Sequence, residues 1–381
     1  MVGLRRAESA LTALYNDLLA RNGGANDLQS LGAVLKTLQR GLTGDRVLAG
    51  AGYFSTEGIL DAYLLYYWPI SYMQASFALD ELEGRGVLPR MERVLDLGAG
   101  SGPASFAAFA WGAKQSVLVD SAGAALRVAK ELSATSGLGV VRTAQVDLSS
   151  DATLPEGPFD LIVASHAMNE LWNNSLEGEE KRAALLARAV RELSPEGILL
   201  VLEPSATVTA VPALRLRDRL LDPSGCLGLR CLGPCLDSNP CPALKAGEGR
   251  SCHSTWAWTP LPFVAGLAAQ AGLERDSVKA TWFALGRTAP DARDTPAALA
   301  GPALSGRIVS EPLLNKAGRL RYILCTGPAW ATLSAKAGDE SAKAAGFFSL
   351  KRGDIIQCDG LEKRAGENSF GYGPMSRMRR A

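Results

Sequence analysis

The sequence has no excess of charge of either sign and no long hydrophobic run. Its 381 residues include 40 lysines and arginines against 39 aspartates and glutamates, a formal net charge of +1. The whole molecule therefore has no strong field to attract nucleic acid or a membrane, and local patches would have to hold an anionic partner. No segment approaches the roughly 20 consecutive apolar residues of a membrane span. The N-terminal stretch contains Glu8 and Asp17, so we expect neither a signal peptide nor a transit peptide.

Apolar residues are abundant, at 47% of the chain, which is enough for one or two packed cores. Helical periodicity dominates residues 1–90, where leucines recur at every third or fourth position. Within this region, residues 61–83 contain six aromatic side chains and are interrupted by Pro69. We interpret them as an aromatic helix pair that packs on the next domain; a base-stacking surface is the alternative.

Short apolar runs separated by helical segments begin at residue 93. Because the runs lack polar alternation, they predict strands that are buried on both faces. Residues 91–206 are thus expected to form an α/β domain with a doubly wound parallel sheet of Rossmann-like fold. The expected strands are residues 93–97, 116–119, 140–146, 159–164 and 198–202.

The remainder of the chain divides into two further regions. Residues 207–290 are predicted to form a Cys-rich metal-binding segment with a closing helix over residues 262–271. Residues 291–381 are predicted to form a small β-rich unit with a basic tail, in which residues 327–345 resemble a low-complexity linker. Strands are expected at residues 307–312, 319–325 and 354–358.

A glycine turn follows the first predicted strand in the sequence VLDLGAGSGP. Pro103 stands where a dinucleotide-binding GxGxxG motif would have its third glycine, so that motif does not match. Gly98, Gly100 and Gly102 instead form GxGxG, which resembles motif I of the class I S-adenosylmethionine (SAM) dependent methyltransferases. The resemblance implies that these glycines, together with Asp96, form part of a SAM site.

Two more acidic residues follow predicted strands. Asp120 ends the second strand, where its carboxylate could accept both ribose hydroxyls of SAM, and Asp147 ends the third, beside the expected adenine. A helix cap or a solvated turn is the alternative role for each acid taken alone. In register with GxGxG, both favour a nucleoside ligand.

The fourth predicted strand ends in a segment where class I methyltransferases keep groups that touch the methyl acceptor. Its candidate catalytic residues are His166, Asn169 and Glu170. His166 could act as a general base because histidine titrates near neutrality; a structural hydrogen bond is the alternative. Glu203 is a further candidate to shape the pocket or accept a proton. Methyl transfer from a sulfonium depends mainly on alignment and exclusion of water, so the lack of an obvious base excludes nothing.

Five of the seven cysteines fall within 27 residues. A chain of this size needs no disulfides, so the cluster predicts metal ligation in a reducing compartment. The spacing differs from the paired CxxC knuckles of zinc ribbons, and all-thiolate ligation favours an iron–sulfur cluster over zinc bound with His253. The clustered residues are Cys226, Cys231, Cys235, Cys241 and Cys252, with Cys325 and Cys358 available as a distant ligand.

Seven short motifs occur in order along roughly residues 60–330: AYLLYYWPISY, VLDLGAGSGPAS, ASHAMNEL, LLVLEPS, GPC, NPCP and SCHSTW. Together they resemble the methyltransferase-like small-ribosomal-subunit family, which includes mitochondrial methyltransferase-like protein 17 and bacterial relatives. The resemblance implies a SAM-binding domain, a four-iron, four-sulfur (4Fe-4S) cluster, and binding of small-subunit ribosomal RNA during assembly of the small ribosomal subunit. The cluster ligands it implies are Cys235, Cys241, Cys252 and Cys325.

The sequence departs from that family after the first ligand, where Leu236 and Asp237 replace the usual Pro-His. The spacer between the second and third ligands is also longer. Cys226, Cys231 and Cys358 therefore remain alternatives for the fourth ligand, and zinc remains the alternative metal.

We expect a cytoplasmic SAM-dependent methyltransferase, or methyltransferase-like assembly factor, that takes part in translation through small-subunit rRNA. A non-catalytic RNA-binding factor, in which SAM and the cluster only stabilise the fold, is the second hypothesis. A small-molecule methyltransferase with a zinc-stabilised lid is the third. The densest basic patch available for phosphate is Arg215, Arg217, Arg219 and Arg230, with a solvated face as the alternative.

Overall fold

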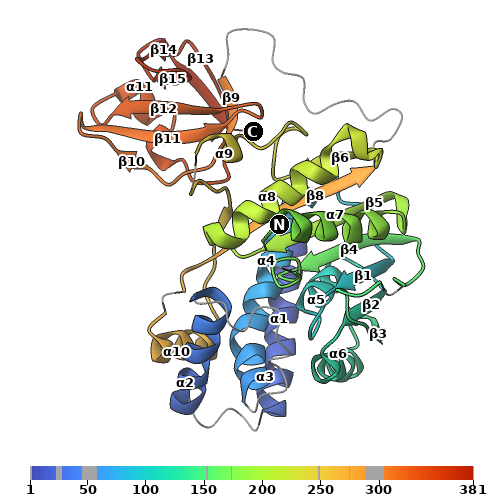
Figure 1. Ribbon diagram of the computed structural model, residues 1–381. Coiled ribbons are helices and arrows are strands. Elements are labelled where there is room, and N and C mark those ends of the chain that lie inside the picture. Colours follow the sequence, from blue (N-terminus) through green and yellow to red (C-terminus); the bar gives the residue numbers. More distant parts are fainter. Residues whose placement is uncertain are drawn as a thin grey trace.

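A computed structural model of the chain contains two β-sheets flanked by helices (Figure 1). Among the described helices, none is long and apolar enough to cross a membrane. The residues described are 2–22, 28–44, 58–151, 153–172, 174–247, 249–273, 275–287 and 304–380.

The first sheet has parallel strands in the order β3-β2-β1-β4-β5, and β8 and β6 extend it beyond β5. β8 is antiparallel to β5, β6 and β7. The prediction of a doubly wound α/β fold is therefore confirmed, and the sheet also includes strands from residues 207–290. The strands are β1 (Arg93–Leu97), β2 (Gln115–Asp120), β3 (Val140–Gln145), β4 (Phe159–Ser165), β5 (Leu193–Glu203), β6 (Leu229–Gly233), β7 (Ser254–Ala257) and β8 (Ser277–Arg287).

β5 begins earlier than predicted. Its pairing with β4 runs from Leu193 opposite Phe159 to Ile198 opposite Leu161, with a register shift between them. The Ser-Pro-Glu-Gly turn residues, 194–197, are accommodated in this irregularity. The helix before the strand, α7 (Leu176–Val190), accordingly ends at Val190.

Helices cover both faces of the sheet because side chains alternate along each strand. Ile198 and Leu200 of β5 belong to the core shared with α1, α4, α5, α6 and α10, whereas Leu199 and Val201 belong to the core shared with α7 and α8. α2 lies beside α10 at one end of the molecule (Figure 1). The helices are α1 (Val2–Arg21), α2 (Leu28–Gln39), α4 (Trp68–Gly84), α5 (Pro103–Ala110), α6 (Gly123–Ser136), α7 (Leu176–Val190), α8 (Thr207–Leu221) and α10 (Pro262–Ala271).

The aromatic segment forms one continuous helical run rather than an interrupted pair. α3 (Ile59–Ala62) leads into a π-turn, η3 (Tyr63–Tyr67), and then α4. Pro69 lies inside this run and has no N–H to donate, and the Leu65 carbonyl, four residues before it, accepts a hydrogen bond from the Tyr15 hydroxyl at 2.7 Å. Trp68 donates from Nε1 to the Ser101 carbonyl at 3.2 Å. The interpretation that this segment packs on the α/β domain is thus confirmed.

Residues 304–380 form a separate sheet in the order β14-β15-β12-β11-β9-β13-β16, with β10 paired to β11. Its core contains Tyr322, Phe347 and Tyr372. The prediction of a linker at residues 327–345 is wrong, because this Gly/Ala-rich stretch contains β12 and the short helix α11 (Glu340–Ala344). The strands are β9 (Leu304–Ile308), β10 (Leu313–Leu314), β11 (Arg319–Cys325), β12 (Trp330–Lys336), β13 (Ile355–Asp359), β14 (Glu362–Lys363), β15 (Ser369–Gly371) and β16 (Arg377–Arg380).

A buried ion pair joins this C-terminal β unit to the α/β domain. Arg307 of β9 forms an ion pair with Glu81 of α4 and also donates to the Pro234 carbonyl and the Ser254 hydroxyl. Although burial opposes it, the guanidinium groups of Arg307 and Arg85 hold the pKa of Glu81 below its usual value. The C-terminal unit is therefore anchored on the same helix that packs against the glycine turn.

Candidate active site

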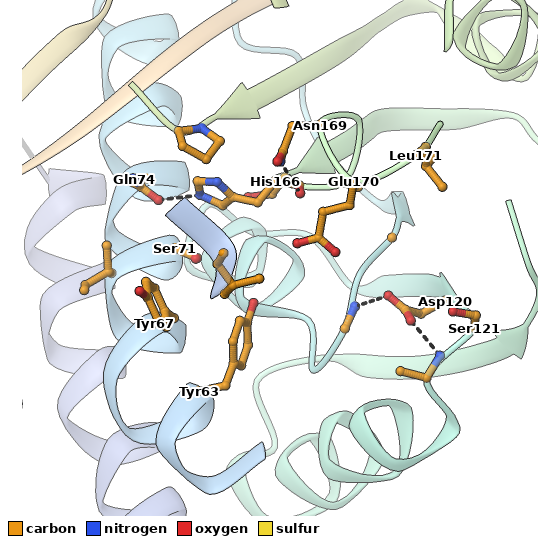
Figure 2. A pocket seen from close by; sticks show the side chains of 18 of the residues that line it. Tyr63, Tyr67, Ser71, Gln74, Asp120, Ser121, His166, Asn169, Glu170 and Leu171 are labelled. Carbon is orange, nitrogen blue, oxygen red and sulfur yellow. Dashed lines mark hydrogen bonds between the residues drawn. The ribbon is translucent and has the colours of Figure 1, made fainter. Parts of the chain in front are cut away.

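A cavity of about 960 Å³ opens at the carboxyl ends of the parallel strands (Figure 2). The loops after β1 to β5 line it, which is where ligands bind in doubly wound sheets. The π-turn η3, helix α4 and the start of β8 complete the wall. Seven of the predicted site residues line it: Gly98, Gly100, Asp120, Asp147, His166, Asn169 and Glu170.

All three motif glycines have a left-handed backbone, with φ of +67° at Gly98, +52° at Gly100 and +78° at Gly102. A Cβ at Gly98 would collide with the Cβ of Ala167, and one at Gly102 would approach Leu118 to 2.7 Å. At Gly100, nothing lies within 4 Å of an added Cβ. Gly98 and Gly102 thus serve the packing of the turn, whereas Gly100 presents bare backbone to the cavity.

Asp120 ties the glycine turn to the next loop. Its Oδ2 accepts a hydrogen bond from the Gly100 amide and its Oδ1 accepts one from the Ala122 amide, both at 2.7 Å (Figure 2). Each carboxylate oxygen has a second lone pair that can receive a ligand hydroxyl. Asp120 is therefore positioned both to support the turn and to bind a diol.

Asp147 is held by its own turn at the end of β3. Its Oδ1 accepts hydrogen bonds from the Ser149 hydroxyl at 2.6 Å and the Ser149 amide at 2.8 Å. These bonds lower the pKa of Asp147, so the carboxylate is charged at neutral pH.

Asp96 and Gly102 do not line the cavity, although the motif resemblance included both. Asp96 is 1% exposed and accepts a hydrogen bond from the Ser105 hydroxyl at 2.6 Å. Burial raises the pKa of Asp96 to about 7. In the absence of ligand, both residues contribute to the packing of the glycine turn against α5 rather than to its exposed surface.

The protonation state of His166 follows from its neighbours. Gln74 donates from Nε2 to the Lys279 carbonyl at 2.7 Å, so its Oε1 must be the atom that faces His166 Nε2 at 2.7 Å. Nε2 therefore carries the ring proton and Nδ1 carries a lone pair. Burial lowers the pKa of His166 to about 4, so the ring is neutral at physiological pH.

Asn169 links the loop after β4 to the end of β5. It donates from Nδ2 to Glu203 Oε2 at 2.6 Å and to the His166 carbonyl at 2.7 Å. Glu203 is 1% exposed, and burial, with a smaller contribution from the nearby Glu170, raises its pKa to about 8. Glu203 is thus protonated at neutral pH, and its hydrogen bonds with Asn169 support the loop after β4.

Several cavity residues come from elements that sequence reasoning did not connect to the site. Tyr63 and Tyr67 come from η3, Gln74 from α4, Lys279 from the start of β8, and Arg275 from the segment just before β8. The one feature of the sequence that could have pointed to Gln74 is that its polar amide lies in a mainly apolar and aromatic stretch of helix. Arg275 and Lys279 carry no local motif, because only the antiparallel placement of β8 brings them to the cavity.

A second, smaller cavity of about 30 Å³ lies between the α/β domain and the C-terminal β unit. Exposed Cys226 does not line it, and Cys358 is buried in the core of the β unit. In the part of the chain that the structure describes, no group of three or more His, Cys, Asp or Glu side chains is arranged to hold a metal ion. The cysteines that line the cavity are Cys235, Cys241, Cys252 and Cys325.

Two buried guanidinium groups accompany these cysteines. Arg217 is 1% exposed and donates to Asp218 at 2.5 Å, and Arg307 lines the cavity itself. A hydrogen bond from the Cys231 thiol, together with Arg217 and Arg307, lowers the pKa of Cys235 to about 6. The prediction that Arg217 belongs to a phosphate-binding surface patch is therefore wrong, because its position on α8 directs its side chain into the protein.

Comparison with known proteins identifies one domain. Residues 90–227 match the family profile of a methyltransferase domain. No curated protein shows significant similarity to the chain.

Solved structures with a similar fold include three SAM-dependent methyltransferases. One from Clostridium acetobutylicum has 20% identity, a TM-score of 0.29, and coverage of 34% of this chain and 49% of that chain. One from Leishmania major has 16% identity, a TM-score of 0.38, and coverage of 68% and 86%. A TehB-like enzyme from Corynebacterium glutamicum has 16% identity, a TM-score of 0.34, and coverage of 56% and 88%. The chain thus spans about half the length of the first of these.

The buried acid Glu203 predicts a specific pH dependence of stability. Its folded pKa of about 8 lies above the ordinary 4.5, so the folded protein holds an extra proton between these values. The associated stability is complete below about pH 4.5 and is lost as the pH rises through 8. Glu203→Gln cannot ionise, so its midpoint of thermal unfolding should rise relative to that of the wild type between pH 6 and pH 9. Asp96 and His166 titrate in both proteins and cancel in the comparison; parallel pH profiles would contradict the prediction.

Proposed function

We propose that the chain is a SAM-dependent methyltransferase whose cofactor binds in the 960 Å³ cavity. The observation that carries the proposal is the open backbone at Gly100, held by Asp120 at the carboxyl end of the sheet. The missing side chain at Gly100 lets a ligand approach the backbone closely. The remaining lone pairs of the Asp120 carboxylate can accept hydrogen bonds from a ribose diol, so the two features together suit a nucleoside ligand. The methyltransferase-domain match over residues 90–227 supports the same assignment.

The residues present fit SAM along the strand order. Asp147 and Leu148 would lie beside adenine, Asp120 would bind the ribose hydroxyls, and the Gly98–Gly100 backbone would pack on the methionine portion. When bound, SAM supplies an electrophilic methyl group on a sulfonium. Glu170, which also lines the cavity, adds negative potential for this cation.

His166 is the group best placed to receive the proton of the methyl acceptor. Its neutral ring has a lone pair on Nδ1, because Gln74 fixes the proton on Nε2. Gln74 is therefore a positioning residue, and Asn169 holds the same loop from the other side. Burial disfavours a lasting positive charge on His166, so its main contribution is to orient an acceptor N–H or O–H toward the methyl group.

SAM binding can be tested with two matched glycine variants. Gly100→Ala and Gly137→Ala both place a Cβ at a left-handed position, with φ of +52° and +62°, and neither Cβ meets an atom within 4 Å. Each should therefore cost a similar amount of stability, about 1 kcal/mol. Only Gly100 lines the cavity. Isothermal titration calorimetry should show SAM binding by wild type and Gly137→Ala and its loss in Gly100→Ala; no heat with the wild type would exclude the cofactor.

We further propose that Cys235, Cys241, Cys252 and Cys325 hold a 4Fe-4S cluster, as the resemblance implies. All four line one cavity, three from the segment between β6 and β7 and the fourth from β11 of the C-terminal unit, although among the described residues they are not arranged as a set of metal ligands. Arg217 and Arg307 supply positive charge that would compensate thiolates. A bound cluster would supply an electron-transfer or structural centre, and its thiolates would connect the two sheets.

The proposed 4Fe-4S cluster predicts the iron and sulfide content of the purified protein. Protein purified without oxygen should be brown and contain roughly four irons and four sulfides per chain. Cys252→Ser should lose most of the iron, whereas the exposed Cys226→Ser should retain it. Colourless protein that contains zinc would contradict the cluster and favour the zinc-stabilised alternative.

The acceptor partner that we propose is small-subunit ribosomal RNA, which would place the protein in assembly of that subunit. The resemblance to the small-ribosomal-subunit family motivates this proposal, and the charge distribution supports it. Residues 304–380 contain 13 lysines and arginines against 7 aspartates and glutamates, a net charge of +6, whereas the rest of the chain has a net charge of −5. The exposed Arg377 and Arg379 lie on the edge strand β16, where a phosphate backbone could bind them.

Mapping of methyl groups on small-subunit rRNA tests the partner. Cells that lack the protein should lose a methyl group, which wild type restores and Gly100→Ala does not. Defective subunits with an unchanged map would instead indicate a non-catalytic assembly factor. Normal subunits with an unchanged map would indicate a small-molecule acceptor.

A further inference from the structure

We propose that the methyl acceptor carries an anionic oxygen group, a phosphate or a carboxylate, which binds to Arg275 and Lys279 at the β8 end of the cavity. The inference rests on the proposed methyltransferase function and names the substrate class of the same site. It comes from the distribution of charge along the cavity and from the contacts that hold Arg275.

The charges that line the cavity change sign along the strand order. Asp147 follows β3 and Asp120 ends β2, whereas Lys279 lies near the start of β8 and Arg275 lies two residues before that strand. Four strand spacings separate β2 from β8 in the sheet. At about 4.8 Å for each spacing, the acidic and basic ends are roughly 19 Å apart. One cavity therefore has two ends of opposite charge.

The acidic end matches the proposed donor. The ribose hydroxyls of SAM suit carboxylate acceptors, and its sulfonium is a cation. Glu170, in the loop after β4, is the last acidic residue along the strand order among the described residues that line the cavity; beyond it lie neutral groups, among them Gln74 and Pro204, and then the two cations. The anionic group of the donor, its methionine carboxylate, is only a few bonds from the ribose and does not reach the β8 end, so these cations are available to the acceptor.

Arg275 is oriented without a carboxylate. Its Nε and Nη2 donate to the Tyr66 hydroxyl at 3.0 and 2.7 Å, and its guanidinium carbon lies 5.3 Å from the centre of the Tyr66 ring. Within the described ranges, neither Arg275 nor Lys279 takes part in an ion pair. A guanidinium fixed through one edge keeps its Nη1 donors for an oxygen ligand, and the absence of a neutralising acid leaves its field intact.

The position of His166 gives the acceptor its orientation. His166 follows β4, between the donor end and the cationic end, and Gln74 joins it to the backbone of Lys279. An acceptor anchored by its anionic group on Arg275 would therefore present its other end to His166 and the methyl group. The volume of about 960 Å³ admits a donor together with a metabolite or with one nucleotide, so an RNA acceptor would enter the cavity by a single nucleotide.

Anion binding to the SAM-saturated full-length protein tests the proposal. Inorganic phosphate and acetate are titrated at constant ionic strength against chloride, and the midpoint of thermal unfolding is recorded. At least one of the two anions should raise the midpoint in a saturable manner. The double variant Arg275→Gln, Lys279→Gln should bind that anion about tenfold more weakly or worse, because charge-assisted hydrogen bonds are lost.

Two control variants separate a specific site from general charge effects. Lys316→Gln removes an exposed positive charge from the C-terminal β unit and should leave anion binding unchanged. Arg275→Lys keeps the charge and should retain part of the binding, even if the contact with Tyr66 is weakened. Equal anion binding by the wild type and the double variant, or none by a wild type that binds SAM, would overturn the proposal. Failure of SAM binding itself would instead refute the proposed function.

The same assay distinguishes the two sources of the anionic group. The protein is titrated with nucleoside 5′-monophosphates and with succinate. Either the nucleotides should bind more tightly than inorganic phosphate, or succinate should bind more tightly than acetate. Preference for the nucleotides would assign a phosphate-bearing acceptor, and preference for succinate would assign a carboxylate. Both results support an anionic acceptor, whereas binding of neither class above the level of chloride would contradict it.

Discussion

The geometry of the cavity depends on two hydrogen bonds that the Asp120 carboxylate accepts. One carboxylate holds the Gly100 amide and the Ala122 amide, so the loops after β1 and β2 keep a fixed separation. The absence of a side chain at Gly98 then lets Ala167, in the loop after β4, pack directly on the same turn. The donor side and the acceptor side are thus built against one glycine turn, and neither can move without the other. Alignment of this kind is what methyl transfer chiefly requires.

Burial removes most of the ionic charge from the floor of this cavity. Glu203 and His166 are neutral at physiological pH because a buried charged form is disfavoured, and Asp96 is near its midpoint. Neutral groups can be hydrogen-bonded in fixed positions at less cost than ions. The acidic and basic side chains that line the cavity therefore dominate the field felt by a ligand: Asp120, Asp147 and Glu170 toward one end, and Arg275 and Lys279 at the other.

Local patterns in the sequence predicted the parts of the site that one strand and its following loop contain. Strand β1 with the GxGxG turn, and helix α10, have the expected bounds. Gln74 and Lys279 are hydrogen-bonded although they are 205 residues apart, and no local pattern predicts such a pair. Arg217 was misplaced for a related reason, since only the packing of α8 on the cysteine segment decides that it faces inward. The small residues of 327–345 obscured β12, whose burial comes from neighbouring strands.

Helix α4 connects the two cavities. Gln74 on this helix positions His166, and Glu81, seven residues later, pairs with Arg307 beside the cysteines. Seven residues of α-helix rise about 10 Å, or two turns, so both contacts lie on one face of one rigid element. An axial shift of α4 would therefore alter both contacts together. The Trp68 ring contacts the Phe106 ring of α5, with centres 5.9 Å apart, and this contact and the hydrogen bond from Trp68 to Ser101 hold α4 against the glycine turn. Helix α4 is thus the element that keeps the proposed metal centre, His166 and the glycine turn in fixed positions relative to one another.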